Sequence, residues 1–273
     1  MLKNILGWFL GVLFTIWFLR KQRELLVEVS KMGTNASSLD DVLPNPSRRD
    51  IYHVAFLLQQ RLPPELIPRI LDYAEYWLRS TVKVRQPMEV SDLRVLTWRT
   101  EYIVPGVTYL STLPIGQCPG DEDGVALVGQ HPVRKVVFTV ESQDQGWSDY
   151  RDDHGTERGS WTWFEAVVRE PGQLVYQDLL RSSMDALSSE EQRRATLPQP
   201  PTGRLIYKNL HAEGRWRRYV RTWSIFDEDD EIKTWILELK RGQIIDLTVW
   251  ARFPGWRNRV AGAKIDVYLA AVR

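Results

Sequence analysis

The hydrophobic and polar positions of the chain follow three patterns in succession. Residues 5–19 form an apolar run without a single charge. Apolar residues then recur at helical spacing between residues 47 and 77, and from about residue 90 they alternate with polar residues at every second position. The sequence therefore predicts an apolar N-terminal helix, a short helical segment and a domain of β-strands.

The apolar run from Ile5 to Leu19 has the character of a membrane anchor. At about 1.5 Å per residue it covers about 22 Å, less than the roughly 30 Å hydrocarbon core of a bilayer. Lys3 precedes the run, whereas three basic residues follow between positions 20 and 23, and basic flanks stay on the cytosolic side. We expect residues 1–23 to be an uncleaved single-pass anchor that contacts the lipid bilayer and leaves the C-terminal domain in the cytosol. The alternatives are a cleaved signal or targeting peptide and a buried core helix.

Composition divides the rest of the chain into segments. Residues 24–46, with Asn, Ser, Asp and Pro in their second half, are typical of a linker. Residues 47–89 form the predicted helical segment, and Ser47 caps its first helix. Residues 90–273 form the predicted β-domain, with residues 173–203 as a surface insertion.

Eight strands are expected because apolar and polar residues alternate between turn-forming Gly, Pro, Asn and Asp clusters. The clearest alternation is at 263–270, where Ala263, Ile265, Val267 and Leu269 share one face and the other face is expected to be solvated. Helical patterns between the strands are scarce, which argues against parallel βαβ winding and favours an antiparallel β-sandwich or jelly roll. The predicted strands are 96–104, 134–140, 161–168, 204–208, 216–224, 232–239, 243–250 and 263–270.

A Leu-Pro-Pro-Glu-Leu motif at residues 62–66 marks the start of a second helix, which Pro68 is expected to disturb. This stretch resembles the opening of an F-box, a helical bundle that docks on the Skp-type adaptor of a cullin ubiquitin ligase. The alternative is a helix that packs against the following domain. On one helical face lie Leu66, Ile70, Tyr73 and Trp77. The resemblance implies an adaptor-binding surface made of Leu62, Leu66, Ile70 and Trp77.

Three tryptophan-rich stretches of the β-domain carry a second resemblance. They are residues 144–148 (Asp-Gln-Gly-Trp-Ser), 159–165 (Gly-Ser-Trp-Thr-Trp-Phe-Glu) and 249–259, which include Trp-Ala-Arg-Phe-Pro-Gly-Trp. Together with the helical lead-in they resemble a group of uncharacterised fungal proteins over roughly residues 47–273. The sandwich of that group is similar in pattern to galactose-binding-like domains, which implies ligand binding at loop ends.

Composition and charge narrow the classes of function. Among 273 residues, 36 Lys and Arg stand against 35 Asp and Glu, so no overall field attracts nucleic acid, and none is expected as a partner. Cys118 is the only cysteine, which excludes an intramolecular disulfide and a cysteine-based zinc site. No nucleophile elbow, paired metal-binding histidines or phosphate-binding glycine loop is present, so we expect no enzyme and no cofactor. The remaining catalytic candidates are two carboxylate pairs, Glu141 with Asp144 and Glu165 with Asp152.

Two polar loops of the predicted sandwich combine tryptophan with charge. The loop 141–158 has six acidic residues and two arginines around Trp147, an indole that is costly to expose unless something covers it. Around residue 256, arginines flank a second tryptophan, where they can stack on rings and pair with acids. The alternatives are a solvated loop, a Ca²⁺ site, and arginines that merely cover the ring. If both loops reach one end of the sandwich, they form a ligand-binding site made of Asp144, Trp147, Asp149, His154, Arg252, Trp256 and Arg257.

A third charged stretch is expected to neutralise itself. Residues 204–221 carry six basic side chains against Glu213, and the acidic run 227–231 follows at once. Together these patterns predict a membrane-anchored, cytosol-facing binding protein whose sandwich loops recognise a ligand or protein partner. The alternatives are an F-box-like substrate receptor and a lumenal or secreted carbohydrate-binding domain, which would carry a glycan on Asn35.

Overall fold

The computed structural model describes residues 45–91, 94–97, 100–103, 106–117, 129–175, 178, 203–253 and 255–272. Outside these residues lie the predicted anchor, the predicted linker up to residue 44, Cys118 and most of the predicted insertion 173–203. Among the described residues, no helix is long and apolar enough to cross a membrane. The described chain divides into two compact units, one made of residues 45–79, 129 and 268–272 and the other of the residues between 80 and 267 apart from 129.

The described chain is mainly β, with three α-helices and two short 3-10 helices. The helices are α2 (Arg48–Gln59), η1 (Pro64–Leu66), α3 (Ile67–Tyr73), η2 (Arg151–Asp153) and α6 (Asp230–Glu238). The strands are β1 (Leu78–Val84), β2 (Met88–Ser91), β3 (Arg94–Thr97), β4 (Thr100–Ile103), β5 (Val107–Ser111), β6 (Val133–Gln143), β7 (Thr162–Arg169), β8 (Arg204–Lys208), β9 (Arg217–Ser224), β10 (Ile244–Ala251) and β11 (Arg257–Leu269).

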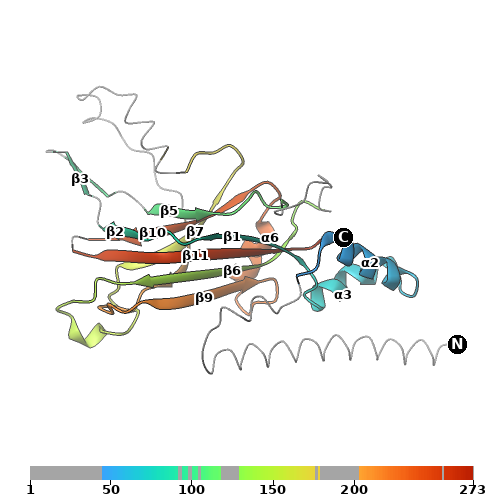
Figure 1. The fold of residues 1–273 in the computed structure, drawn as a ribbon, viewed down its shortest axis with the longest axis horizontal. Helices are drawn as coiled ribbons and strands as arrows, with labels where there is room; N and C mark the ends of the chain where they lie inside the picture. Colours follow the sequence, from blue (N-terminus) through green and yellow to red (C-terminus); the bar gives the residue numbers. More distant parts are fainter. Residues whose placement is uncertain are drawn as a thin grey trace. The chain divides into compact units, whose positions relative to one another are not determined.

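The strands form two larger sheets and one hairpin. The first sheet has the order β1-β11-β6-β9, and β2 also pairs with β11. The second sheet has the order β5-β10-β7-β8, and β3 pairs with β4 in the hairpin. Figure 1 shows β11, β6 and β9 side by side in that order. The pairings β5–β10, β7–β10, β7–β8, β2–β11, β3–β4 and β6–β9 are antiparallel, which confirms the prediction of a mainly β chain with antiparallel, sandwich-like sheets.

Side chains of the two larger sheets meet in a shared core. Tyr207 of the second sheet stacks on Tyr219 of the first sheet with a centroid distance of 4.2 Å. Phe164, Val140 and Ile265 are fully or almost fully buried. A buried side chain of this size contributes about 2–3 kcal/mol relative to an exposed one, so this layer supplies much of the folding free energy.

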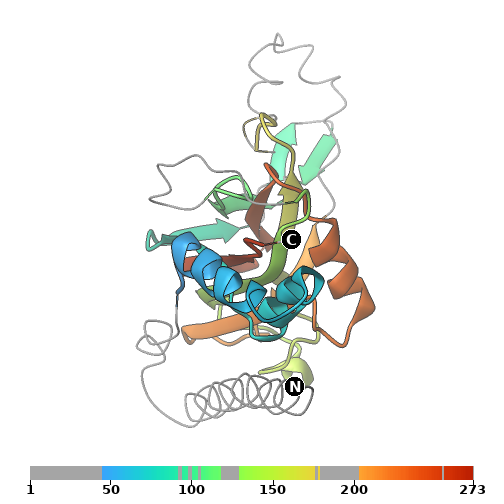
Figure 2. The ribbon, with the colours of Figure 1, turned by 90° about the vertical axis from the view of Figure 1, so that its right-hand side faces the viewer.

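Four predicted strands match observed strands closely, but two predictions are wrong. The single strand predicted at 96–104 is instead the two strands β3 and β4, which pair as a hairpin. The strand predicted at 232–239 is instead the helix α6 and its C-cap Leu239. Asp229 is the N-cap of α6, and its carboxylate accepts the backbone N–H groups of Glu231 and Ile232. α6 packs against β6 and β9 beside the sheets (Figure 2), and its Trp235 meets Trp223 edge to face at 4.8 Å. The cap and this aromatic contact favour a helix over a strand in this segment.

The strands β1, β2 and β5 are not predicted from the sequence, and the last strand begins at Arg257 rather than at the predicted residue 263. In β11 the predicted apolar face, from Ala263 to Leu269, is buried, as expected. The opposite face is not fully solvated, because Asp266 is buried there. The carboxylate of Asp266 accepts Thr81 Oγ1 at 2.6 Å and pairs with Lys264 Nζ at 2.8 Å, and these two partners compensate its burial.

The helical unit begins with the capping box that the sequence predicts, in which Ser47 and Asp50 bond each other's backbone N–H groups. The Pro-led helix differs from the prediction. The chain makes the 3-10 turn η1 and then α3, so that Pro68 lies in the first turn of α3, where it is tolerated. The buried face of α3 consists of Ile67 and Leu71, whereas Tyr73 is exposed. The predicted apolar face was therefore wrong by one position.

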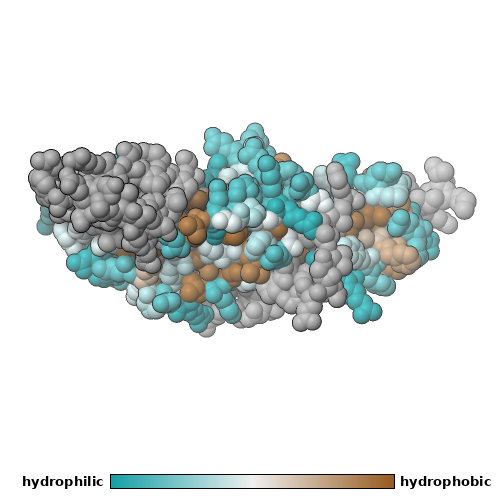
Figure 3. Space-filling view, turned by 90° about the horizontal axis from the view of Figure 1, so that it is seen from above, coloured by the Kyte–Doolittle hydropathy of each residue, from teal (hydrophilic) through white to brown (hydrophobic). Residues whose placement is uncertain are grey.

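α2 leaves large hydrophobic side chains on the surface of this unit. Tyr52, Phe56 and Leu57 are exposed, while Ile51 faces the interior. Figure 3 shows hydrophobic surface over this helix among hydrophilic side chains.

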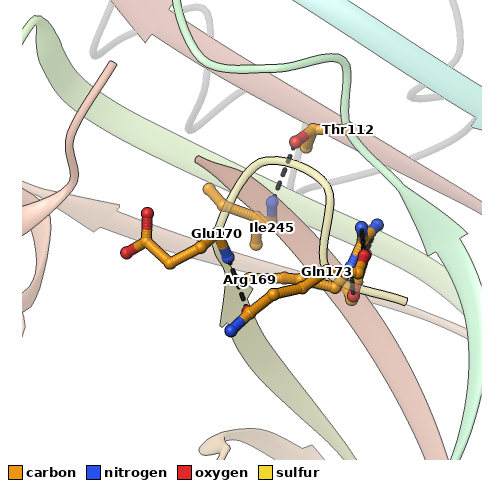
Figure 4. Close-up of polar contacts among 6 residues, drawn as sticks. Thr112, Arg169, Glu170, Gln173 and Ile245 are labelled. Carbon is orange, nitrogen blue, oxygen red and sulfur yellow. Dashed lines mark hydrogen bonds and ion pairs between the residues drawn. The ribbon is translucent and has the colours of Figure 1, made fainter. Parts of the chain in front are cut away.

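Hydrogen bonds close one end of the second sheet (Figure 4). Arg169, at the end of β7, donates from Nε to Asp246 Oδ2 at 2.8 Å and from Nη1 to the backbone oxygen of Gln173 at 2.6 Å. On β10, the N–H of Ile245 donates to Thr112 Oγ1 at 3.0 Å. Asp246 and Arg169 have little solvent exposure, so a buried ion pair joins β7 to β10 at this end.

Candidate functional site

Three loops meet at the other end of the sheets. The strand registers pair Ser142 with Arg217, Trp163 with Lys208 and Ala251 with Thr162. The β6–β7 loop (144–161), the β8–β9 loop (209–216) and the β10–β11 loop (252–256) therefore leave their strands at one end. We call these three loops the loop end. The two charged loops of the sequence analysis belong to it, and the β8–β9 loop joins them.

A buried polar network lies beneath the loops. The amide nitrogen of Asn209 donates to Thr162 Oγ1 at 3.0 Å and to Asn258 Oδ1 at 2.9 Å. Its oxygen accepts Ser142 Oγ at 2.7 Å. These four residues are at most 1% exposed and come from both sheets. Because the amide of Asn209 has fixed partners on every side, the network holds the base of the loop end rigid.

Asp144 ties the first loop to the second. Its Oδ1 accepts the backbone N–H of Gln145 at 2.5 Å and its Oδ2 that of Ala212 at 2.9 Å. Burial raises the pKa of Asp144 from 3.8 to about 6, although both N–H donors and the nearby His211 favour the charged form. Asp144 has no exposed surface, so it acts on a ligand only through the loops that it positions.

His211 is enclosed by residues of the loop end. Its backbone N–H donates to the oxygen of Thr156 at 2.7 Å, and its Nδ1 lies 3.1 Å from the oxygen of Arg158. Its ring stacks on His154 with a centroid distance of 5.7 Å and meets Trp256 edge to face at 5.2 Å. His211 is almost fully buried, and its Nε2 has no hydrogen-bond partner among the described residues. The histidine therefore joins two predicted site residues, His154 and Trp256.

Trp147 of the first loop contacts the third loop. A methyl group added to Gly255 would stand 3.8 Å from Trp147 Cζ2, so the indole borders the β10–β11 loop. Gln145 reinforces the contact, since its Nε2 donates to the oxygen of Trp147 at 3.1 Å and its Oε1 accepts the N–H of Arg257 at 3.4 Å. The structure thus brings Trp147 together with the 255–257 segment, as the predicted site requires.

Two glycines let the first and second loops touch backbone to backbone. Gly146 has a φ of +87°, which favours glycine, and a Cβ added there would lie 2.9 Å from the Cα of Gly214. No side chain fits between these loops at this point, so they form one continuous surface.

Arg252 belongs to a second aromatic group of the loop end. Its guanidinium carbon lies 5.8 Å from the ring centre of Trp161 and 5.4 Å from that of Phe253. The two rings meet edge to face at 4.7 Å. Phe253 has a φ of +84°, a strained conformation for a side chain of this size, and such strain concentrates at functional loops.

The structure places the remaining predicted residues as follows. Asp149 is exposed on the β6–β7 loop. Arg257 Nη1 lies 3.6 Å from Glu89 Oε1 on β2, so its described ion pair is not with the acidic loop. Asp144, Trp147, His154, Trp256 and Arg257 are thus joined, directly or through Gln145 and His211, while Arg252 lies with Trp161 and Phe253.

Several aromatic residues of the loop end are not among the predicted site residues. Trp161 and Trp216 were assigned to the first position of predicted strands, but the strands begin at Thr162 and Arg217. Because each strand begins one residue later than predicted, both indoles lie in loops rather than in the sheets. The exposed aromatic residues of the loop end are between 37% and 73% exposed, and they are Trp147, Tyr150, Trp161, Trp216 and Phe253.

The members of the two carboxylate pairs proposed from the sequence differ in position or in environment. Glu165 Oε1 accepts Trp163 Nε1 at 2.8 Å on β7, and burial raises the pKa of Glu165. Its proposed partner Asp152 lies in η2 of the loop end. Glu141 is exposed on β6, while Asp144 is buried. Among the described residues, no group of three or more His, Cys, Asp or Glu side chains is placed to hold a metal ion.

The residues of the F-box resemblance differ in exposure. Leu62 and Trp77 are buried in the helical unit. Trp77 meets Tyr268 edge to face at 6.4 Å, and its Nε1 donates to Asp72 Oδ1 at 2.9 Å. Leu66 and Ile70 keep part of their surface exposed.

No protein-family model matches the sequence, and no curated protein is found as a relative. The F-box-like and galactose-binding-like resemblances therefore remain predictions from the sequence.

Proposed function

We propose that this protein is a non-catalytic binding protein, tethered to a membrane by residues 1–23, whose cytosolic β-domain recognises a protein partner through the loop end. The observation that carries this proposal is the set of exposed aromatic side chains on three loops that are fixed to one another. An exposed aromatic cluster loses favourable burial unless a partner covers it.

The chemistry of the loop end supports a protein rather than a small charged ligand. Tryptophan, tyrosine, phenylalanine and arginine are enriched at protein interfaces and dominate binding hot spots. Trp161, Phe253 and Arg252 form such a group, and Trp147 forms a second. The fixed backbone beneath them lowers the entropy lost when a partner binds. Loops at one end of a galactose-binding-like sandwich would place this surface where the resemblance implies ligand binding.

Proximity labelling from the full chain tests the loop end. Trp147→Ala and Trp161→Ala, made separately, are expected to reduce the same set of labelled proteins at least about fivefold, because hot-spot truncations cost more than about 1 kcal/mol. Leu237→Ala is the matched control, since Leu237 is also an exposed hydrophobic residue but lies on α6. An unchanged set in both tryptophan variants, or an equal loss in the control, refutes a binding role of the loop end.

The tether is tested by fractionation. The full chain is expected in the membrane pellet, and a chain that begins at residue 24 is expected in the soluble fraction. Identical behaviour of the two refutes the anchor. A mass spectrum of the mature N-terminus and of Asn35 separates a lumenal carbohydrate-binding protein, which would be cleaved and glycosylated, from a cytosolic one.

A second candidate function is adaptor binding by the helical unit. The exposed hydrophobic residues of α2, together with partly exposed Leu66 and Ile70, favour some interaction by this unit. Capture of a Skp-type adaptor by the full chain, lost in a folded Leu66→Asp, Ile70→Asp variant, supports this candidate. No capture by the unaltered chain rejects it.

A further inference from the structure

β9 stands at the open edge of the first sheet. It pairs with β6 on one side, and no described strand pairs with its other side. Val220, in the middle of β9, is 58% exposed, and Arg221 and Thr222 are exposed beside it. An exposed edge strand offers free backbone donors and acceptors to a further strand.

The register shows which backbone groups are free. Ile225 N–H donates to the oxygen of Arg134 at 3.0 Å, and this pair continues the register of β9 with β6. In an antiparallel ladder, residues bonded to the partner strand alternate with residues whose N–H and C=O point away. Tyr219 and Arg221 therefore bond towards β6, whereas Val220 and Thr222 point their N–H and C=O outwards.

Arginines line this edge. Within 213–224, four arginines stand against one glutamate. Glu213 pairs with Arg217 at 2.9 Å, but Arg215 and Arg221 have no ion pair with a described residue. The acidic run 227–231 pairs with the start of the stretch 204–221 but not with Arg215 or Arg221: Glu231 bonds Arg204 at 3.1 Å, and Asp230 bonds Lys233 at 2.8 Å.

We propose that the outer edge of β9 is a second binding surface, which accepts an extended, acidic segment of a partner protein as an additional strand. The backbone groups of Val220 and Thr222 supply the pairing, and the arginines select for acidic side chains on the added strand. A β-branched residue opposite Val220 would cover its exposed surface. This inference is independent of the proposed function, because it uses no aromatic residue of the loop end.

Charge argues against a second copy of the chain as the occupant. Antiparallel pairing of β9 with itself would bring the arginines of one copy alongside those of the other, and like charges across a sheet are destabilising. Charged edge residues are a common device against such self-pairing. An acidic segment would instead bring its carboxylates alongside these arginines, and each such charge pair is attractive.

The experiment uses the full chain in detergent and a capped peptide in which Glu alternates with Val or Thr. The control peptide has Lys in place of every Glu. Binding of the Glu peptide is expected to slow hydrogen exchange at the amides of Val220 and Thr222 but not at those of Tyr219 and Arg221, which already face β6. Affinity should fall as salt rises.

Val220→Pro removes one outward N–H without removing a bond to β6, and edge strands tolerate proline. This variant is expected to lower the affinity for the Glu peptide about three- to tenfold, which is the equivalent of one hydrogen bond. Val220→Thr is expected to keep the affinity. Arg215→Ala with Arg221→Ala gives a second test that leaves the backbone intact, and it should also weaken binding.

Several results overturn the proposal. They are no binding of the Glu peptide, equal binding of the Lys peptide, and equal affinity of folded Val220→Pro. A single-stranded oligodeoxynucleotide that binds more tightly than the Glu peptide, and is unaffected by Val220→Pro, would assign the arginines to nucleic acid instead.

Discussion

Asp144→Asn is expected to remove a pH dependence from the stability of the protein, because it replaces a buried carboxylate that accepts two backbone N–H groups with an amide that does not titrate. In the folded protein the carboxyl group has a pKa of about 6, compared with 3.8 without burial. This difference corresponds to about 3 kcal/mol. Burial thus disfavours the charged form more strongly than the N–H groups of Gln145 and Ala212 favour it.

The sign of the pH dependence follows from proton binding. Between about pH 4 and pH 6 the unfolded chain has lost the proton of Asp144, while the folded chain still holds it. The contribution of Asp144 to the free energy of unfolding is therefore largest at acidic pH. It falls as the pH rises through this window and is constant above it. Asn does not titrate, and its Nδ2 group only donates, so it loses one of the two hydrogen bonds that Asp144 accepts, at every pH. From pH 4 to pH 7, the free energy of unfolding of Asp144→Asn should therefore rise by about 2 kcal/mol relative to that of the unaltered protein.

Equilibrium urea unfolding of both proteins, followed by tryptophan fluorescence at constant detergent concentration, measures this difference. All other titrating groups are common to both chains and cancel. A difference that does not depend on pH refutes the reasoning. If the stability of the variant relative to the unaltered protein falls rather than rises from pH 4 to pH 7, the N–H donors hold the pKa of Asp144 below its ordinary value.

Three further substitutions are expected to lower the free energy of unfolding, which the same urea assay measures. Gly146→Ala should cost at least about 1–2 kcal/mol, because φ is +87° and the new Cβ meets Gly214; no loss would mean that the two loops separate easily. Arg169→Met should cost about 3–5 kcal/mol by leaving Asp246 buried without its partner, and a neutral result would show that water reaches this carboxylate. Asn209→Ala should cost about 2–4 kcal/mol through lost hydrogen bonds to buried groups, and a smaller loss would indicate repacking beneath the loops.

The sequence predicts the strands of the two larger sheets better than it predicts α6. The strand 204–208 was predicted with the bounds that the structure has, because alternation and flanking turns agree there. The segment 232–239 also contains β-branched and aromatic residues, yet Asp229 caps a helix and Trp235 packs on Trp223. Local capping and a distant contact outweigh strand propensity in this segment.

The loop end was predictable only in part. Tryptophans with neighbouring charges identified two of its loops, since such side chains are unusual in turns. The β8–β9 loop was not identified because His211 carries no motif, and its role depends on rings from loops that are distant in sequence. The positive φ of Phe253 is equally invisible, because nothing in its residue type requires it.

The position of the Asn209 network has a consequence for changing the specificity of this protein. The network lies at the base of the loops and uses none of the exposed rings at their tips. Randomised libraries at Trp147, Tyr150 and Trp216 should therefore yield many variants that still fold, much as antibody loops diversify on a constant framework. The same separation would let natural selection retarget this surface without first rebuilding the domain.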